Sequence, residues 1–147
     1  MMNILTKITQ LLETEKLCFL ATSYKDRPHL SLMNFTYLAE EKLVILSSRA
    51  DTTKVRYIKN NPKIALLLYH SGNNGEIPVS CTLHGTATVL QADKEMYYRD
   101  IHLKKHKDMG AFIEGDNVSI ITVKLRHATL SDLEDRVYNW TAENDVL

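Results

Sequence analysis

The sequence predicts a single small domain that is mainly β with helices, arranged as a six-stranded antiparallel barrel. Six short segments are either apolar or alternate between apolar and polar residues, and tight polar turns join the first three of them. Helical patterns interrupt the strands only after the third and the fifth, which is too few for a βαβ fold. The 147 residues contain no repeat and no linker, so residues 1–147 are expected to form one domain.

The first half is expected to hold one helix and three strands. Apolar residues recur at helical spacing over residues 3–14. Strands follow over residues 17–23, 28–38 and 43–48, separated by polar turns at residues 24–27 and 39–42. Pro28 opens the second strand, a position at which proline is tolerated.

The second half alternates helices and strands. A helix that starts near Thr52 ends at Asn60-Asn61-Pro62, and buried strand 63–70 follows it. Strand 79–90 alternates strictly between apolar and polar residues. Asp93 is expected to cap a helix that runs to about residue 106, and the last strand covers residues 117–125. In the tail, Leu130, Leu133 and Val137 lie at near-helical spacing.

Composition narrows the possible partners. Lys plus Arg and Asp plus Glu each number 18, so the formal net charge is zero, which argues against nucleic acid as the main partner. No apolar run is long enough to span a membrane, and no signal peptide is evident. Cys18 and Cys81 lie far apart in expected strands and are interpreted as free buried thiols. A cytoplasmic location is therefore expected.

The loop between strand 43–48 and the next helix is the strongest candidate site. Ser47, Ser48, Thr52 and Thr53 offer hydroxyl groups there, and Arg49 and Lys54 add positive charge. The free N–H groups of the helix point at the same place, a combination that suits a phosphate. The alternative is an ordinary solvated loop whose helix is capped by Asp51 or Thr52.

Histidines and one tryptophan are further candidates. His102 and His106 lie four residues apart on a helix, which suits a metal ion, but exposed histidines near a helix end are the simpler interpretation. His84 lies on the polar face of strand 79–90, which could face water, a cofactor or a second subunit. Trp140, in an acidic tail expected to be exposed, could anchor the tail or cover a ring-shaped ligand.

Two segments carry a family resemblance. They are residues 19–37, which include Arg-Pro-His-Leu-Ser-Leu-Met-Asn-Phe-Thr-Tyr, and residues 46–66, in which hydroxyl residues, Thr52-Thr53-Lys54 and Asn61-Pro62 follow one another. In both, and in the order of its elements, the chain resembles the pyridoxamine 5′-phosphate oxidase-like FMN-binding split barrels.

The resemblance implies a homodimeric split barrel with one FMN at each of two equivalent sites between subunits. It implies that Lys54, with Ser47 or Ser48 and Thr53, holds the FMN phosphate. The backbone of Leu32, Met33 and Asn34 would then lie along the flavin. From their own sequence contexts, and not from the resemblance, His84 and Trp140 are expected to be further contacts.

Departures from the family pattern bear on activity. Thr53 replaces the usual arginine of the triplet, and Arg49 is a possible substitute. Ser31 and Thr36 stand where true pyridoxamine phosphate oxidases carry Arg and Lys, and their C-terminal arginine-rich motif is missing. Flavin-dependent redox chemistry on another small molecule is therefore expected, with no catalytic side chain assigned. The alternatives are a non-enzymatic flavin-binding or electron-carrier module, a deazaflavin-binding relative, and a barrel that binds no flavin.

Overall fold

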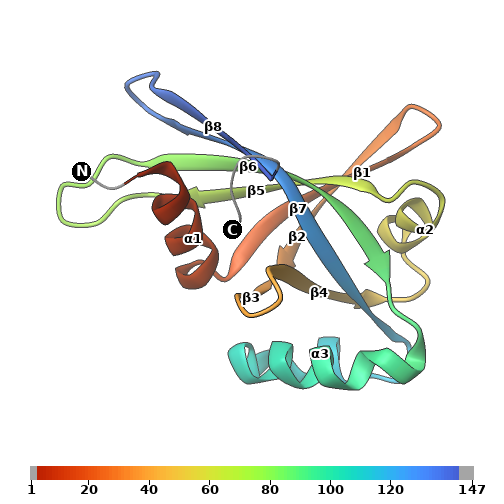
Figure 1. Cartoon of the computed structure of the whole chain (residues 1–147). Coiled ribbons are helices and arrows are strands. Elements are labelled where there is room, and N and C mark those ends of the chain that lie inside the picture. The colour runs from red at the N-terminus through yellow and green to blue at the C-terminus, as the bar shows by residue number, and fades with distance from the viewer. Residues whose placement is uncertain (1–2, 143–147) are drawn as a thin grey trace.

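One antiparallel sheet of eight strands organises the computed structural model, which describes residues 3–142 (Figure 1). Seven strands follow the order β2-β1-β5-β6-β7-β4-β3, and β8 pairs with β7. The strands are β1 (Leu17–Tyr24), β2 (Arg27–Asn34), β3 (Thr36–Leu38), β4 (Leu43–Arg49), β5 (Lys63–His70), β6 (Val79–Val89), β7 (Val118–Asp132) and β8 (Val137–Thr141).

The long strands β6 and β7 form the spine of the sheet, and their pairing is irregular at one point. The register shifts between His84 and Gly85. A Cβ atom on Gly85 would lie 2.6 Å from the carbonyl oxygen of Lys124, so the strands can approach this closely only because residue 85 is glycine. On the inner face of β6, Cys81, Leu83 and Ala87 are buried, as the alternation predicted.

Between residues 3 and 142, four α-helices and one 3-10 turn accompany the sheet, and Figure 1 labels α1 (Ile4–Thr14), α2 (Thr53–Asn60) and α3 (Ala92–Lys105). Helix α1 buries Ile8, Leu11 and Leu12 in the main core. Helix α3 runs beside β3 and β4, where a second, smaller core contains Leu38 and Ile45. The remaining elements are the 3-10 turn Lys107–Met109 and α4 (Gly110–Ile113).

The predicted fold class is confirmed, and all six expected strands are present, but three details differ. Residues 28–38 form two strands, because the buried Phe35 interrupts the ladder and donates its N–H to the carbonyl of Lys16 at 3.0 Å. Gln91, not Asp93, is the N-cap of α3, and it makes no side-chain capping bond.

The third difference is the tail, where the near-helical spacing was misleading. Residues 118–132 form one strand that turns back into β8. The Asp132 carboxylate holds this turn by accepting from the N–H groups of Glu134 and Arg136 at 2.9 and 3.2 Å. Leu130 is buried because it alternates with its strand neighbours, not because it lies on a helix face.

Two features are absent from the part of the chain that the structure describes. Among residues 3–142, no helix combines the length and the apolar character needed to cross a membrane. Over the same range, no three His, Cys, Asp or Glu side chains gather where they could hold one metal ion.

Candidate functional site

A cleft of about 450 Å³ lies where the ends of β2 and β4 meet the start of α2 and the segment after α3. This volume is within the range of small-molecule sites, roughly 300–1,000 Å³. Most of the residues predicted from the sequence line it, namely Leu32, Met33, Asn34, Ser47, Ser48, Arg49 and Lys54. Thr52, another hydroxyl residue of the predicted loop, also lines it. The structure further brings in residues that the sequence did not single out for it: His102, Met109, Phe112 and Ile113.

The hydroxyl groups in the loop between β4 and α2 form hydrogen bonds within that loop. Thr52 is the N-cap of α2, and its Oγ1 accepts from the N–H of Val55 at 3.5 Å. Ser48 Oγ lies 2.9 Å from Thr52 Oγ1, and both hydroxyls are within donating distance of the Arg49 carbonyl, at 3.0 and 3.1 Å. A hydroxyl has only one proton to donate. These two can therefore contact an anion only by rotating away from an internal bond.

The two cations of the loop lack a counter-charge. Lys54 is half-buried, and burial together with the nearby Arg49 lowers its pKa below the usual value. Within residues 3–142, neither side chain forms an ion pair with a carboxylate. Two neighbouring cations repel each other, so a bound anion would relieve an unfavourable interaction.

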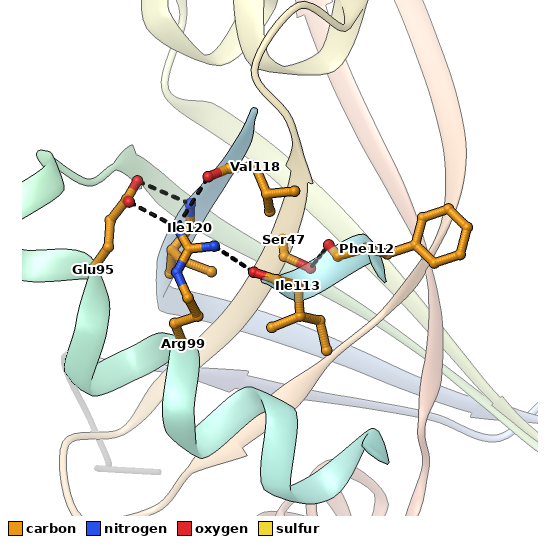
Figure 2. A network of polar contacts seen from close by, with 7 residues as sticks. All are labelled: Ser47, Glu95, Arg99, Phe112, Ile113, Val118 and Ile120. Carbon is orange, nitrogen blue, oxygen red and sulfur yellow. Dashed lines mark hydrogen bonds and ion pairs between the residues drawn. The ribbon is translucent and has the colours of Figure 1, made fainter. Parts of the chain in front are cut away.

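A polar network fixes the opposite wall of the cleft (Figure 2). The Arg99 guanidinium donates to the carbonyl oxygens of Ile113 and Val118 and pairs with Glu95 at 2.8 Å. Ser47 Oγ donates to the Phe112 carbonyl at 3.1 Å, which ties α4 to β4. Bonds from a cation to backbone carbonyls are among the stronger hydrogen bonds, so this wall is well anchored.

His102 and His106 are buried, so the expectation of exposed histidines was wrong. His102 is fully buried, and its Nδ1 lies 2.7 Å from Thr36 Oγ1. His106 donates from Nε2 to the Phe35 carbonyl at 2.7 Å. The burial was not evident from the sequence because charged residues at 104–107 suggested an exposed helix end. The two histidines nevertheless face the sheet. Only their spacing of four residues hinted at a shared face.

Three predicted site residues lie outside the lining of the cleft. Thr53 is the first residue of α2, directly beside Thr52, which does line the cleft. His84 is exposed on β6 and stacks on His127, with ring centroids 4.3 Å apart. Trp140 lies on β8, is only 4% exposed and packs in the main core, which corrects the expectation that it belongs to an exposed tail.

Comparisons with known proteins bear on the family and the fold of the chain. The family model for pyridoxamine 5′-phosphate oxidase matches residues 4–124. A pyridoxamine 5′-phosphate oxidase homologue from Schizosaccharomyces pombe is 30% identical over an alignment of 175 residues, which covers 95% of this chain and 92% of the relative.

Two solved structures share the fold. An FAD-binding protein from Mesorhizobium loti has a TM-score of 0.70 at 17% identity, covering 88% of this chain and 94% of that one. A heme-binding protein from Mycobacterium smegmatis has a TM-score of 0.74 at 16% identity, covering 88% of this chain and 54% of that one. The matched family model and the Schizosaccharomyces pombe relative show that the chain belongs to the pyridoxamine 5′-phosphate oxidase family, with its split-barrel fold.

Proposed function

We propose that the cleft binds FMN and that the protein is a flavin-dependent oxidoreductase acting on a small molecule. One observation carries this proposal: a single cleft is lined both by two cations that have no carboxylate partner among the described residues and by apolar side chains. An anionic tail attached to a flat, largely apolar ring suits both kinds of lining. Membership of a family that typically binds flavin supports the same ligand.

The phosphate would be held by charge and by backbone donors. Lys54 and Arg49 supply the charge, and Thr53 supplies a hydroxyl at the start of α2. The first N–H groups of a helix have no partner within the helix, and its dipole favours an anion. The hydroxyls of Ser48 and Thr52 then act mainly by fixing this loop, since their protons already have acceptors inside it.

The ring would lie toward Leu32, Met33 and Asn34 on one side and Phe112 and Ile113 on the other. Bound flavin supplies hydride or electron transfer, and the protein supplies position and exclusion of water. Met33 and Ile113 are buried and keep this part of the cleft apolar. No side chain is assigned as an acid or base.

A homodimer is part of the proposal, because the outer face of the sheet is apolar. Leu30 and Leu32 on β2, Phe19 on β1, and Leu67 and Tyr69 on β5 are all exposed. The registers pair Phe19 with both Leu32 and Leu67, so these side chains form one continuous face. Leu32 also lines the cleft, so a second copy seated on this face would border the flavin.

Variants of two lysines on α2 test the flavin site. Lys54→Ala should weaken FMN binding about tenfold to a hundredfold, because a charged hydrogen bond contributes roughly 1.5–3 kcal/mol. Lys59→Ala, which removes an exposed lysine from the far end of the same helix, is the matched control. Quenching of flavin fluorescence gives both affinities. Equal affinity of the wild type for FMN and riboflavin would refute the phosphate assignment.

A pair of leucines tests the dimer. Leu30 and Leu133 are similarly exposed, at 70% and 78%, but only Leu30 lies on the apolar sheet face. Leu30→Lys should convert the dimer to a monomer in analytical ultracentrifugation, whereas Leu133→Lys should leave it intact. A wild-type protein that sediments as a monomer while binding FMN tightly would contradict the shared site.

A further inference from the structure

His102 carries a buried polar atom that the fold leaves without a partner. The residue is fully buried and lines the cleft, yet its Nε2 forms no hydrogen bond within residues 3–142. A buried donor or acceptor without a partner costs roughly 1–3 kcal/mol, so such an atom calls for an explanation. Among the described residues with a buried, unpartnered side-chain polar atom, His102 is the one that lines the cleft.

The neighbouring histidine shows that burial on this helix does not by itself leave a ring unpartnered. His106 lies one turn further along α3 and is also buried, and its Nε2 donates to the Phe35 carbonyl at 2.7 Å. The two rings touch edge to face, with centroids 4.8 Å apart. The difference between them is that His102 borders the cleft, where a ligand could provide the missing partner.

The contacts of Thr36 indicate which ring nitrogen of His102 carries the proton. Thr36 Oγ1 lies 2.7 Å from His102 Nδ1, and this is the hydroxyl's one hydrogen bond to the described residues. If Nδ1 were the donor, the buried hydroxyl proton would have no acceptor. Donation from the hydroxyl to Nδ1 satisfies both atoms and places the ring proton on Nε2. The unpartnered atom is therefore an N–H donor that needs an acceptor.

Position along β4 indicates which part of a ligand this donor would meet. Thr36, the partner of His102, pairs with Ile45 on β4, and Ser48 of the phosphate loop lies three residues further along that strand. At about 3.3 Å per residue, Ile45 and Ser48 are ~10 Å apart along β4. Because His102 is hydrogen-bonded to the residue opposite Ile45, and not to the loop at residues 48–54, we expect it to face a part of the ligand other than the phosphate.

We propose that His102 binds the ring of the flavin, donating one hydrogen bond from Nε2 to a carbonyl oxygen or an unprotonated ring nitrogen at its edge. This assignment rests on the proposed function of the cleft and adds a ring-binding residue to it. His102 stays uncharged in this role: burial, with smaller effects of His106 and Lys105, lowers its pKa to about 3. The contact should therefore persist across the neutral pH range.

Two substitutions and two ligands separate a ring contact from a phosphate contact. His102→Phe removes the donor and keeps a flat ring, whereas His102→Gln keeps an N–H near the position of Nε2. His102→Phe should weaken FMN and riboflavin by the same factor, roughly threefold to tenfold for one neutral hydrogen bond, and His102→Gln should restore most of the affinity. Lys54→Ala, in contrast, should weaken FMN alone.

A measurement on the unmodified protein covers the case in which His102→Phe fails to fold. In a long-range ¹H–¹⁵N spectrum of histidine-labelled protein, His102 should show the Nε2-protonated form, and its Nε2 signal should move on addition of either FMN or riboflavin. Unchanged affinity of His102→Phe for both flavins, or an Nε2 signal that flavin does not move, would overturn this assignment while leaving the flavin site in place. If the wild type binds no flavin at all, the proposed function fails first.

Discussion

Acid should destabilise this protein well before its carboxylates are protonated, because α3 buries His102 in its neutral form. The ring is fully buried against Thr36, with His106 and Lys105 as its nearest titratable neighbours on the helix. In the unfolded chain the same ring is solvated and takes up a proton near its ordinary pKa of 6.5. Below that pH the unfolded state binds more protons than the folded state, so stability falls as the pH falls.

The size of the effect follows from the two pKa values of His102. They are 6.5 in the unfolded chain and about 3 in the folded protein, so the loss develops between pH 6.5 and 3. Each pH unit in that window contributes about 1.36 kcal/mol, so lowering the pH from 7.5 to 5.0 should remove about 2 kcal/mol. His106, whose pKa is also lowered by burial, adds a loss of the same sign.

Urea denaturation at pH 7.5 and 5.0 measures this loss as the change in the free energy of unfolding. A loss of about 2 kcal/mol corresponds to a midpoint shift of roughly 1 M urea for a chain of this size. His102→Phe should reduce the difference between the two pH values by about 2 kcal/mol, whatever its own stability. His29→Gln, which changes a partly exposed histidine outside α3, should retain the full difference. If His102→Phe shows the same pH dependence as the wild type, His102 is not the buried neutral group inferred here.

Three further substitutions test other parts of the structure. Arg99→Ala should lower the free energy of unfolding by about 2–4 kcal/mol and weaken FMN binding, because it leaves the Ile113 carbonyl without its donor and frees α4, which forms one wall of the cleft. Unchanged urea midpoints would contradict this. Gly85→Ala should lower the free energy of unfolding by about 1–3 kcal/mol in the same assay, because its Cβ would clash with the Lys124 carbonyl oxygen. An unchanged free energy would mean that β6 and β7 can move apart at this point without cost. Trp140→Ala should cost about 3–5 kcal/mol as a core truncation and leave the FMN affinity of the folded protein unchanged; a large change in bound-flavin fluorescence would show that the indole contacts the ligand after all.

The parts of the site that local sequence could predict are those made by consecutive residues. Strand β4, the hydroxyl-and-cation loop and the start of α2 follow one another directly, so their positions are fixed by neighbours in the sequence. The helix stop at Asn61-Pro62 is likewise a local signal, and α2 ends there with Asn61 as its C-cap. Local pattern alone therefore predicts that Arg49 and Lys54 share one site, and both of them line the cleft.

The other wall could not be predicted because long-range contacts create it. Phe112 is brought to the cleft by a bond to Ser47, 65 positions earlier in the chain. His102 is hydrogen-bonded to Thr36, 66 positions away. Trp140 was misplaced for a related reason: its acidic neighbourhood suggested solvent, but pairing with Ala128 on β7 carries it into the core. No local sequence pattern predicts which strands will pair in this way.

Ser47 and Ser48 are adjacent on β4, but their hydroxyls serve opposite sides of the cleft. Successive side chains of a strand point to opposite faces, so one hydroxyl reaches α4 and the other reaches the cap of α2. The two walls are thereby anchored to adjacent residues of one strand. Because hydrogen bonds already hold both walls, ligand binding should immobilise few further side chains. Little of the binding free energy is then lost to ordering the protein. Ligands should then associate in one step at a rate set by diffusional encounter. Differences in affinity among ligands should arise mainly from their dissociation rate constants.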